Sequence, residues 1–230
     1  KGIFLKRRQY GNGAYAGEND VSKRGLVLMG LEAWRTEYRK QILEIMEYSR
    51  IAYGKNLVSA AGGNVSARCG RYVAVTASSV SLRRVKEQDL ALMTMNGQPA
   101  DLQDGKRASK ETPFHLHIYR LRPEINYVMH LHPCYSILWS MENQELPLFT
   151  ESAKLKLTQV PVIPDEKPGS PELAEAVYRT VKEAPETSRA FFLKNHGILV
   201  MGTEMEECLN LAELLEDTAK IAVLHSILTK

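Results

Sequence analysis

Hydrophobic residues recur at helical spacing at both ends of the chain. From Glu32 to Tyr53, and again from Glu204 to Leu228, they lie on one side of a helix, which predicts two amphipathic helices. Shorter helices are expected over residues 110–121, where Pro123 stops the first, and over residues 171–182. A further short helix is expected after the apolar run that ends near residue 132.

Other stretches have the pattern of strands. RYVAVTAS (residues 71–78) alternates in the way of a half-buried strand, and LALMT (90–94) precedes an Asn-Gly turn. YVMHLH (127–132) is a third strand, and AFFLKNHGILVMG (190–202) contains two apolar halves. VPVIP (160–164) is an extended piece, whereas AAGGNVSAR (60–68) is predicted to be a loop of small residues.

Strands and helices are interleaved irregularly, which predicts an α/β fold of the α+β type. We expect three α/β/α layers with a central, mostly antiparallel sheet between helices. The chain has 230 residues, of which 44% are hydrophobic, enough for the core of one large domain. Residues 31–230 are therefore predicted to form this domain, and residues 1–30, which are charged and without periodicity, an N-terminal extension.

Composition removes several classes of partner. Thirty Lys and Arg against 27 Asp and Glu leave a net charge of +3, which does not predict nucleic-acid binding. The three cysteines lie far apart, so neither a disulfide framework nor a thiolate zinc site is indicated. No apolar stretch reaches the roughly 20 residues of a membrane helix, and no secretory leader is found. We expect a cytoplasmic protein without a membrane partner.

Three of the six histidines form a candidate metal site. His130 and His132 are two residues apart on a predicted strand, so their side chains project from the same face. His196 stands beside a glycine where a strand end meets a loop. Three neutral imidazoles with one open position are typical of a catalytic zinc site. The alternative is that each histidine separately satisfies a hydrogen bond in the core.

The histidines of FHLH do not extend this site. His115 and His117 lie two residues apart on a predicted helix, where side chains diverge by about 200°, so they cannot bind one ion together. Glu111 lies near the start of the same helix. It could be a fourth ligand or a general base, or it could merely complement the helix dipole.

Three stretches have the chemistry of an anion site. The glycines of GGN allow a turn whose N–H groups can face an anion, although many such loops are only turns. VTASSVS offers hydroxyls, and RASKE offers a hydroxyl and an ammonium before a helix. Together with a metal, these stretches predict a phosphorylated small molecule as the substrate.

These motifs, in this order, resemble the class II aldolase and adducin family. GGNVSAR, VTASSVS, RASKE, HLHP and KNHGIL are similar to its five motifs, and the resemblance covers roughly residues 32–228. It implies zinc held by His130, His132 and His196, with Glu111 as fourth ligand and catalytic acid/base. Mn²⁺, Co²⁺ and Fe²⁺ suit the same donors. It also implies a substrate phosphate surrounded by Gly63, Asn64, Ser78, Ser79, Ser109 and Lys110.

The resemblance further implies a metal-dependent lyase that acts on a phosphorylated sugar or sugar acid through an enediolate. Aldol cleavage of a ketose phosphate is the first expectation. Decarboxylation of a 3-oxo sugar-acid phosphate, epimerisation and dehydration are alternatives, and a non-catalytic adducin-type interaction module is a further one. Members of the family commonly form homotetramers with active sites at subunit interfaces, and we expect the same here.

The sequence also departs from the family pattern. Ala61, Ala77 and Ser79 stand where an aldolase of the family has threonine, proline and glycine, and Lys110 replaces a serine. The lysine adds a point charge for an anionic group. Glu151 falls roughly where that aldolase has its proton-donating tyrosine. Glu151 is therefore either a catalytic carboxylate or an exposed carboxylate at a helix start.

Overall fold

The structure is a computed structural model that describes residues 33–102, 105–142 and 145–229. The chain divides into two compact units, Lys1–Glu37 and Tyr38–Lys230, and the fold described here is that of the second. The predicted extension of residues 1–30 lies outside the described residues, so it stays a prediction.

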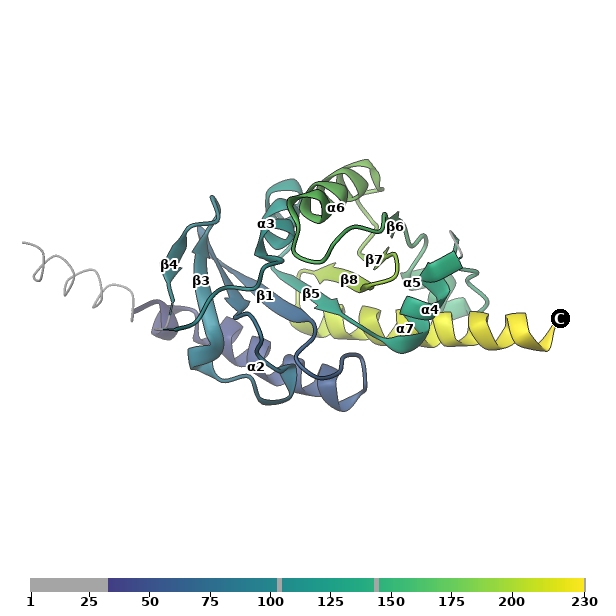
Figure 1. The fold of residues 1–230 in the computed structure, drawn as a ribbon, viewed down its shortest axis with the longest axis horizontal. Coiled ribbons are helices and arrows are strands. Elements are labelled where there is room, and N and C mark those ends of the chain that lie inside the picture. Colours follow the sequence, from purple (N-terminus) through teal and green to yellow (C-terminus); the bar gives the residue numbers. More distant parts are fainter. Residues whose placement is uncertain (1–32, 103–104, 143–144, 230) are drawn as a thin grey trace, which may run out of the picture. The chain divides into compact units, whose positions relative to one another are not determined.

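One eight-stranded sheet forms the centre of the second unit, with the strand order β4-β3-β2-β1-β5-β8-β7-β6 (Figure 1). Every pairing is antiparallel except the parallel pair of β6 and β7. The strands are β1 (Asn64–Cys69), β2 (Tyr72–Thr76), β3 (Leu90–Thr94), β4 (Pro99–Asp101), β5 (Tyr127–Leu131), β6 (Val162–Ile163), β7 (Ala190–Leu193) and β8 (Gly197–Gly202).

Helices cover both faces of this sheet, as Figure 1 shows. One layer contains α3 and α6, which pack on each other; the other contains α2 and α7, with α4 and α5 against α7. The helices are α2 (Arg39–Gly54), α3 (Thr112–Leu121), α4 (Cys134–Glu142), α5 (Glu151–Lys156), α6 (Pro171–Glu183) and α7 (Met205–Leu228), and two short 3-10 helices are Leu82–Arg84 and Glu87–Asp89. The predicted three-layer fold with a mostly antiparallel sheet is confirmed.

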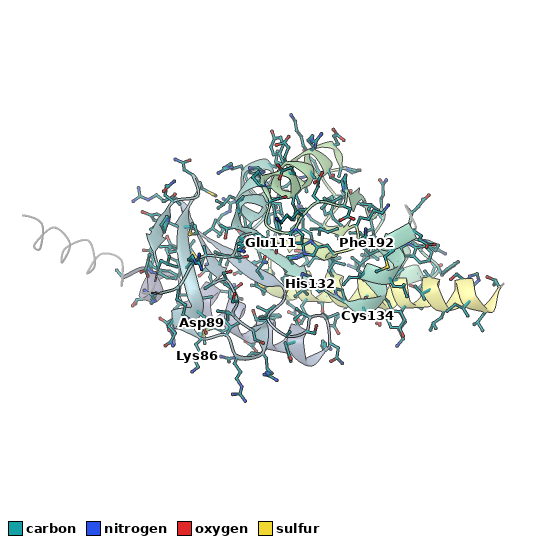
Figure 2. All side chains as sticks on the ribbon, viewed as in Figure 1. Lys86, Asp89, Glu111, His132, Cys134 and Phe192 are labelled. Atoms are coloured by element: carbon teal, nitrogen blue, oxygen red, sulfur yellow. The ribbon has the colours of Figure 1, made fainter. Side chains whose placement is uncertain are left out.

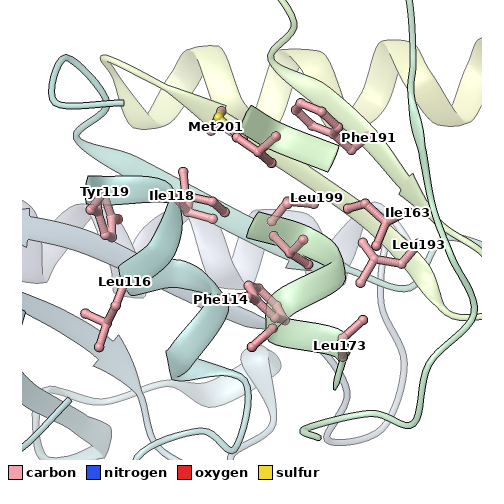
Figure 3. Close-up of a cluster of buried hydrophobic side chains, with 14 of the residues drawn as sticks. Phe114, Leu116, Ile118, Tyr119, Ile163, Leu173, Phe191, Leu193, Leu199 and Met201 are labelled. Atoms are coloured by element: carbon pink, nitrogen blue, oxygen red, sulfur yellow. The ribbon is translucent and has the colours of Figure 1, made fainter. Parts of the chain in front are cut away.

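A buried apolar cluster joins the layer of α3 and α6 to the sheet. Phe114 and Ile118 of α3 and Val177 of α6 meet Phe191 of β7 and Leu199 of β8, all at most 1% exposed (Figure 3). Burying a side chain of this size contributes about 1.5–3 kcal/mol to folding. The cluster therefore fixes α3 on the sheet, and with it the residues at the start of that helix.

The structure corrects three predictions of local structure. Residues 60–68 are a loop only as far as Gly63, because NVSARC forms β1. Nearly all of β1 is buried, including the polar Asn64 and Ser66, so the usual alternation of polar and apolar residues is lost. The first predicted helix is interrupted by a turn at Tyr38, so that α2 begins at Arg39. Two short helices, α4 and α5, replace the single one expected after β5.

Candidate metal centre

The structure brings His130, His132 and His196 together at one end of the central strands. His130 lies on β5, His132 follows it, and His196 ends the turn that leads into the neighbouring β8. The ligand atoms of the three side chains all lie within 4.8 Å of one another, and the Nε2 atoms of His130 and His132 are 2.9 Å apart. The antiparallel pairing of β5 with β8 brings His132 and His196 together, although they are 64 positions apart in the sequence.

Hydrogen bonding and burial keep these imidazoles ready to bind a cation. His130 Nδ1 donates to the Ile198 carbonyl oxygen at 2.9 Å, so the lone pair of its Nε2 faces the other histidines. Burial, together with the neighbouring histidines, lowers the pKa of His130 and of His132 to about 3. The pKa of His196 is also lowered, mainly by burial. Neutral imidazole is the form that binds metals.

Glu111 completes the cluster from the start of α3. Its carboxylate oxygens lie 3.4 Å from His130 Nε2 and 3.5 Å from His196 Nε2, and Asn64 Nδ2 donates to Oε2 at 2.7 Å. Figure 2 shows Glu111 and His132 in the middle of the second unit. The predicted position of Glu111 near a helix start is confirmed, since it is the residue before the first turn of α3.

The donor set fits a divalent cation. Within the described part of the chain, Glu111 Oε1 and His196 Nδ1 are buried without a hydrogen-bond partner, which a protein interior rarely tolerates. A bound cation would satisfy the Glu111 oxygen. Three imidazole nitrogens with a carboxylate beside two of them match the ligand types of catalytic zinc sites, and equally those of related divalent metals.

Two glycines make room for the His132 ring. A Cβ on Gly62 would lie 2.6 Å from His132 Nδ1, closer than real Cβ atoms approach. A Cβ on Gly197 would overlap the Leu131 carbonyl oxygen and come within 2.9 Å of the His132 ring. The glycines of the GGN and NHG motifs therefore have a packing role at the metal centre.

A cavity of about 710 Å³ opens beside the cluster. Glu111, His132 and His196 line it. The residues predicted to surround a phosphate all line the same cavity: Gly63, Asn64, Ser78, Ser79, Ser109 and Lys110. Lys106 and Arg107 line it as well. Arg107 is the first residue of the motif RASKE and Lys106 precedes it, and neither is among the predicted site residues. Lys106 is paired with Asp89 at 2.5 Å.

The structure gives several of these residues local partners. Gly62 N–H donates to the Ser59 carbonyl oxygen, so this amide is not directed at the cavity. Ser109 Oγ accepts the Glu111 backbone N–H at 3.2 Å. Asn64 donates to Glu111, as described above. Ser109 and Asn64 therefore hold Glu111 in place, in addition to any contact with a ligand.

Glu151 lies apart from this group. It is in the first turn of α5, its side chain is 81% exposed, and Lys154 Nζ is 2.6 Å from its carboxylate. Glu151 is not one of the described residues that line the cavity. Its catalytic role stays a prediction, and within one chain the structure does not bring it to the metal centre.

His115 is a residue whose place the sequence reasoning missed. It is fully buried, and its Nε2 lies 2.5 Å from Asn64 Oδ1, directly behind the amide that holds Glu111. Burial is the largest cause of a pKa lowered to about 3. His117, its neighbour in FHLH, points elsewhere and contacts the Ala174 carbonyl oxygen of α6. The available signal was the spacing of Glu111 and His115, four residues apart on one helix face.

Comparison with known proteins agrees with this geometry. The family model described as Class II Aldolase and Adducin N-terminal domain matches residues 43–223. The chain belongs to the class II aldolase and adducin family. It is 31% identical over 180 residues to L-fuculose phosphate aldolase of Methanococcus maripaludis, covering 78% of this chain and 94% of that protein. It is 32% identical over 183 residues to 3-oxo-tetronate 4-phosphate decarboxylase of Haemophilus influenzae, covering 77% and 84%.

The solved structures agree with the family assignment. YgbL of Klebsiella pneumoniae superimposes with a TM-score of 0.73 at 25% identity, over 81% of this chain and 89% of that one. The predicted membership of the class II aldolase and adducin family is confirmed, and so is the prediction of an enzyme, since these relatives are named as aldolases and decarboxylases. None of the described helices has both the length and the apolar character that crossing a membrane requires.

Proposed function

We propose that this class II aldolase family member is a metal-dependent lyase that cleaves a phosphorylated ketose by a retro-aldol reaction. The observation that carries the proposal is the cluster of His130, His132 and His196, with Glu111 beside two of them. It lies at the edge of a cavity that is also lined by three cations, Lys106, Arg107 and Lys110. A metal ion and the phosphate group of the substrate can therefore be bound side by side.

His130, His132 and His196 would hold the cation, and Glu111 would be its fourth ligand in the resting site. When bound, a divalent cation supplies Lewis acidity for the negative charge that develops on substrate oxygens as the carbon bond breaks. Zinc is the proposed ion, and Mn²⁺, Co²⁺ or Fe²⁺ suits the same donors. Glu111 is the proposed acid/base, because its Oε1 is buried at the cavity without a hydrogen-bond partner among the described residues.

The remaining cavity residues would bind the phosphate and orient the substrate. Ser78 and Ser79 provide hydroxyls, Gly63 an amide in a left-handed turn with φ of 72°, and Lys110 an exposed ammonium. Gly169 packs against the Lys110 stem, where an added Cβ would lie 2.8 Å from Lys110 Cβ. A phosphate fixed at a distance from the breaking bond lets its binding energy be used for orientation.

Decarboxylation of a 3-oxo sugar-acid phosphate is the second candidate. The cavity is lined by three cations, Lys106, Arg107 and Lys110, and neither Arg107 nor Lys110 has a carboxylate partner within the described ranges. A substrate with both a carboxylate and a phosphate would use them better than a phosphate alone. The similarity to a decarboxylase is as high as that to an aldolase.

Exposed apolar side chains support assembly into a homotetramer. They lie on α4, α5 and α7 and, for Phe149, in the loop just before α5; α4 and α5 each pack against α7. The set consists of Leu138, Met141, Phe149, Leu155, Leu224, Ile227 and Leu228, each at least 44% exposed. We propose that this apolar set is covered by another subunit of a cytoplasmic homotetramer, with active sites at the subunit interfaces.

Metal content is the first test. Protein purified without chelator is compared with His132→Ala and with His117→Ala, a control histidine on α3 that faces α6. We expect near-stoichiometric metal and turnover in the wild type and the control, and loss of both in His132→Ala, because one of three imidazole ligands is removed. Full activity after removal of all metal would contradict the proposal.

Product analysis then separates the two reactions. A triose or glycolaldehyde phosphate released from a phosphorylated ketose identifies an aldolase, and carbon dioxide released from a 3-oxo sugar-acid phosphate identifies a decarboxylase. A wild-type protein that binds metal tightly but turns over neither class would instead support a non-catalytic interaction module.

A further inference from the structure

A chain of buried hydrogen bonds runs from the Glu111 carboxylate into the core. Asn64 Nδ2 donates to Glu111 Oε2 at 2.7 Å, and Asn64 Oδ1 lies 2.5 Å from His115 Nε2. His115 Nδ1 lies 2.7 Å from Ser66 Oγ, which lies 2.8 Å from the Tyr119 hydroxyl. We call Asn64, His115, Ser66 and Tyr119 the buried chain.

The donor and the acceptor of each hydrogen bond in the buried chain can be assigned by starting from the Glu111 carboxylate. A carboxylate only accepts, so the amide nitrogen of Asn64 must face Glu111 and its oxygen must face His115. His115 Nε2 then carries the proton, and a neutral ring leaves Nδ1 to accept from the Ser66 hydroxyl. Ser66, having donated its only hydrogen, accepts from the Tyr119 hydroxyl at 2.8 Å; the Tyr119 oxygen also lies 3.4 Å from the Asn126 carbonyl oxygen, a longer and weaker contact. All donors thus point toward Glu111, an arrangement in which successive hydrogen bonds strengthen one another.

Local geometry places these residues in register. Glu111, His115 and Tyr119 are four residues apart on one face at the start and along α3, while Asn64 and Ser66 are two apart on one face of β1. Asn64 is also the cross-strand partner of His130. The face of α3 that carries His115 and Tyr119 therefore meets the face of β1 that carries Asn64 and Ser66, directly behind the cluster of histidines.

The buried chain is almost completely removed from solvent, and among its members Asn64 alone lines the cavity. Asn64 is 4% exposed, Tyr119 is 1% exposed, and His115 and Ser66 are fully buried. At these positions a lost partner cannot be replaced by bulk water, so each member depends on the next. At the cavity end, Asn64 donates to the Glu111 carboxylate, which is the group proposed to bind the cation and move the proton; at the other end, the Tyr119 hydroxyl also lies 3.4 Å from the Asn126 carbonyl oxygen.

We propose that His115, supported by Ser66 and Tyr119, is a positioning residue that acts through Asn64 to fix the orientation of the Glu111 carboxylate at the metal centre. The catalytic part of this inference rests on the proposed function. The positioning part concerns the resting protein with a metal ion and needs no substrate.

The test compares His115→Leu, His115→Gln, Ser66→Ala and Tyr119→Phe with the control His117→Gln. Leucine removes both hydrogen bonds of His115, whereas the glutamine amide can still donate to Asn64. His117 lies on the same helix but contacts α6, so its replacement leaves the buried chain intact. Circular dichroism and thermal unfolding first show which variants are folded. Co²⁺ affinity and the visible spectrum of bound Co²⁺, which reports the ligands, are then measured without substrate.

We expect the Co²⁺ spectrum of His115→Leu to change and its metal affinity to fall about 10- to 100-fold, the range seen when residues behind metal ligands are replaced. His115→Gln should recover part of this loss, Ser66→Ala and Tyr119→Phe should show progressively smaller effects, and His117→Gln none. In turnover assays kcat should fall while KM for the phosphorylated substrate stays within about twofold, since Ser78, Ser79 and Lys110 are not disturbed.

Unchanged Co²⁺ spectra and affinities in folded His115→Leu would overturn the inference, whatever its thermal stability. If His115→Leu does not fold, the same result for Ser66→Ala and Tyr119→Phe overturns it. A wild type that binds no Co²⁺ overturns it together with the proposed function. Altered spectra in a protein that turns over no phosphorylated sugar would support the positioning role and overturn only the function.

Discussion

At the scale of single residues, the metal centre depends on positions that carry no side chain. The His132 ring lies between Gly62, the residue before a left-handed turn, and Gly197, the first residue of β8. At Gly197 an added Cβ would meet the Leu131 backbone, which cannot move without shifting β5. The imidazole is therefore held in place by backbone on two sides.

Replacing Gly197 by alanine should therefore disturb both folding and metal binding. We expect Gly197→Ala to lose about 1–3 kcal/mol of unfolding free energy, the usual cost of overpacking a core, and to bind less than stoichiometric metal because the His130 and His132 rings are displaced. Denaturant unfolding and elemental analysis measure the two effects.

Gly54→Ala is the matched control, since a Cβ at the end of α2 meets nothing within 4 Å. Alanine also has the higher helix propensity, so this variant should be as stable as the wild type or slightly more so. Equal stability and metal content in Gly54→Ala and Gly197→Ala would show that the close approach at Gly197 does not matter.

At the scale of elements, one carboxylate of α7 fixes the helix that follows the histidine pair. Glu216 accepts the backbone N–H groups of Tyr135 and Ser136 at 2.9 and 2.8 Å, and the Ser136 hydroxyl at 2.7 Å. These are free N–H groups of the first turn of α4, which starts two residues after His132. Glu216 thus caps α4 from another helix and limits how far the end of β5 can move.

Glu216→Ala should therefore destabilise the protein by about 1–3 kcal/mol, because three donors lose their acceptor. Glu213→Ala is the control: Glu213 lies on the same helix and pairs with Lys55 at the surface, a pair worth less than about 1 kcal/mol. Denaturant midpoints of the two variants provide the comparison. A loss in Glu216→Ala no larger than that of Glu213→Ala would refute the capping role.

Most elements could be predicted from the sequence because their patterns were regular. The strand of the histidine pair and the hairpin around Asn195 have apolar runs that only a buried strand explains, and α6 and α7 have clear helical spacing. The strand β1 was missed because Asn64 and Ser66 put polar groups on a buried face. Their partners, His115 and Tyr119, lie about 50 residues away, so no local window could show that they are satisfied.

At the scale of the whole molecule, the sheet order explains which site residues could be predicted to meet. The spacing along one strand was enough to predict that His130 and His132 lie together. His196 joins them because β8 pairs with β5, and Glu111 joins them because α3 packs on the sheet. Before the structure, motif resemblance was the only guide to that arrangement. Lys106 lies outside the five motifs and Arg107 is the first residue of RASKE, and only the fold shows that both side chains line the cavity.

The apolar set on α4, α5 and α7 leads to a prediction about assembly. Replacing Leu155 and Ile227, which are 75% and 63% exposed, by aspartate should reduce the oligomer to smaller species in size-exclusion chromatography with light scattering. Leu43→Asp on α2, where the leucine is 44% exposed, should leave the oligomer intact. An unchanged mass in the double variant would show that this surface is not a subunit contact.

The contact between Gly62 and His132 has a mechanical consequence. Gly62 belongs to the turn that lines the cavity, and a Cβ on it would lie 2.6 Å from His132 Nδ1. If the turn changes its conformation when an anion binds, the His132 ring must either move with the turn or oppose that change. Anion binding and metal binding are therefore expected to be energetically linked, so that inorganic phosphate alone should change the affinity for the metal, and the metal that for phosphate, by the same factor.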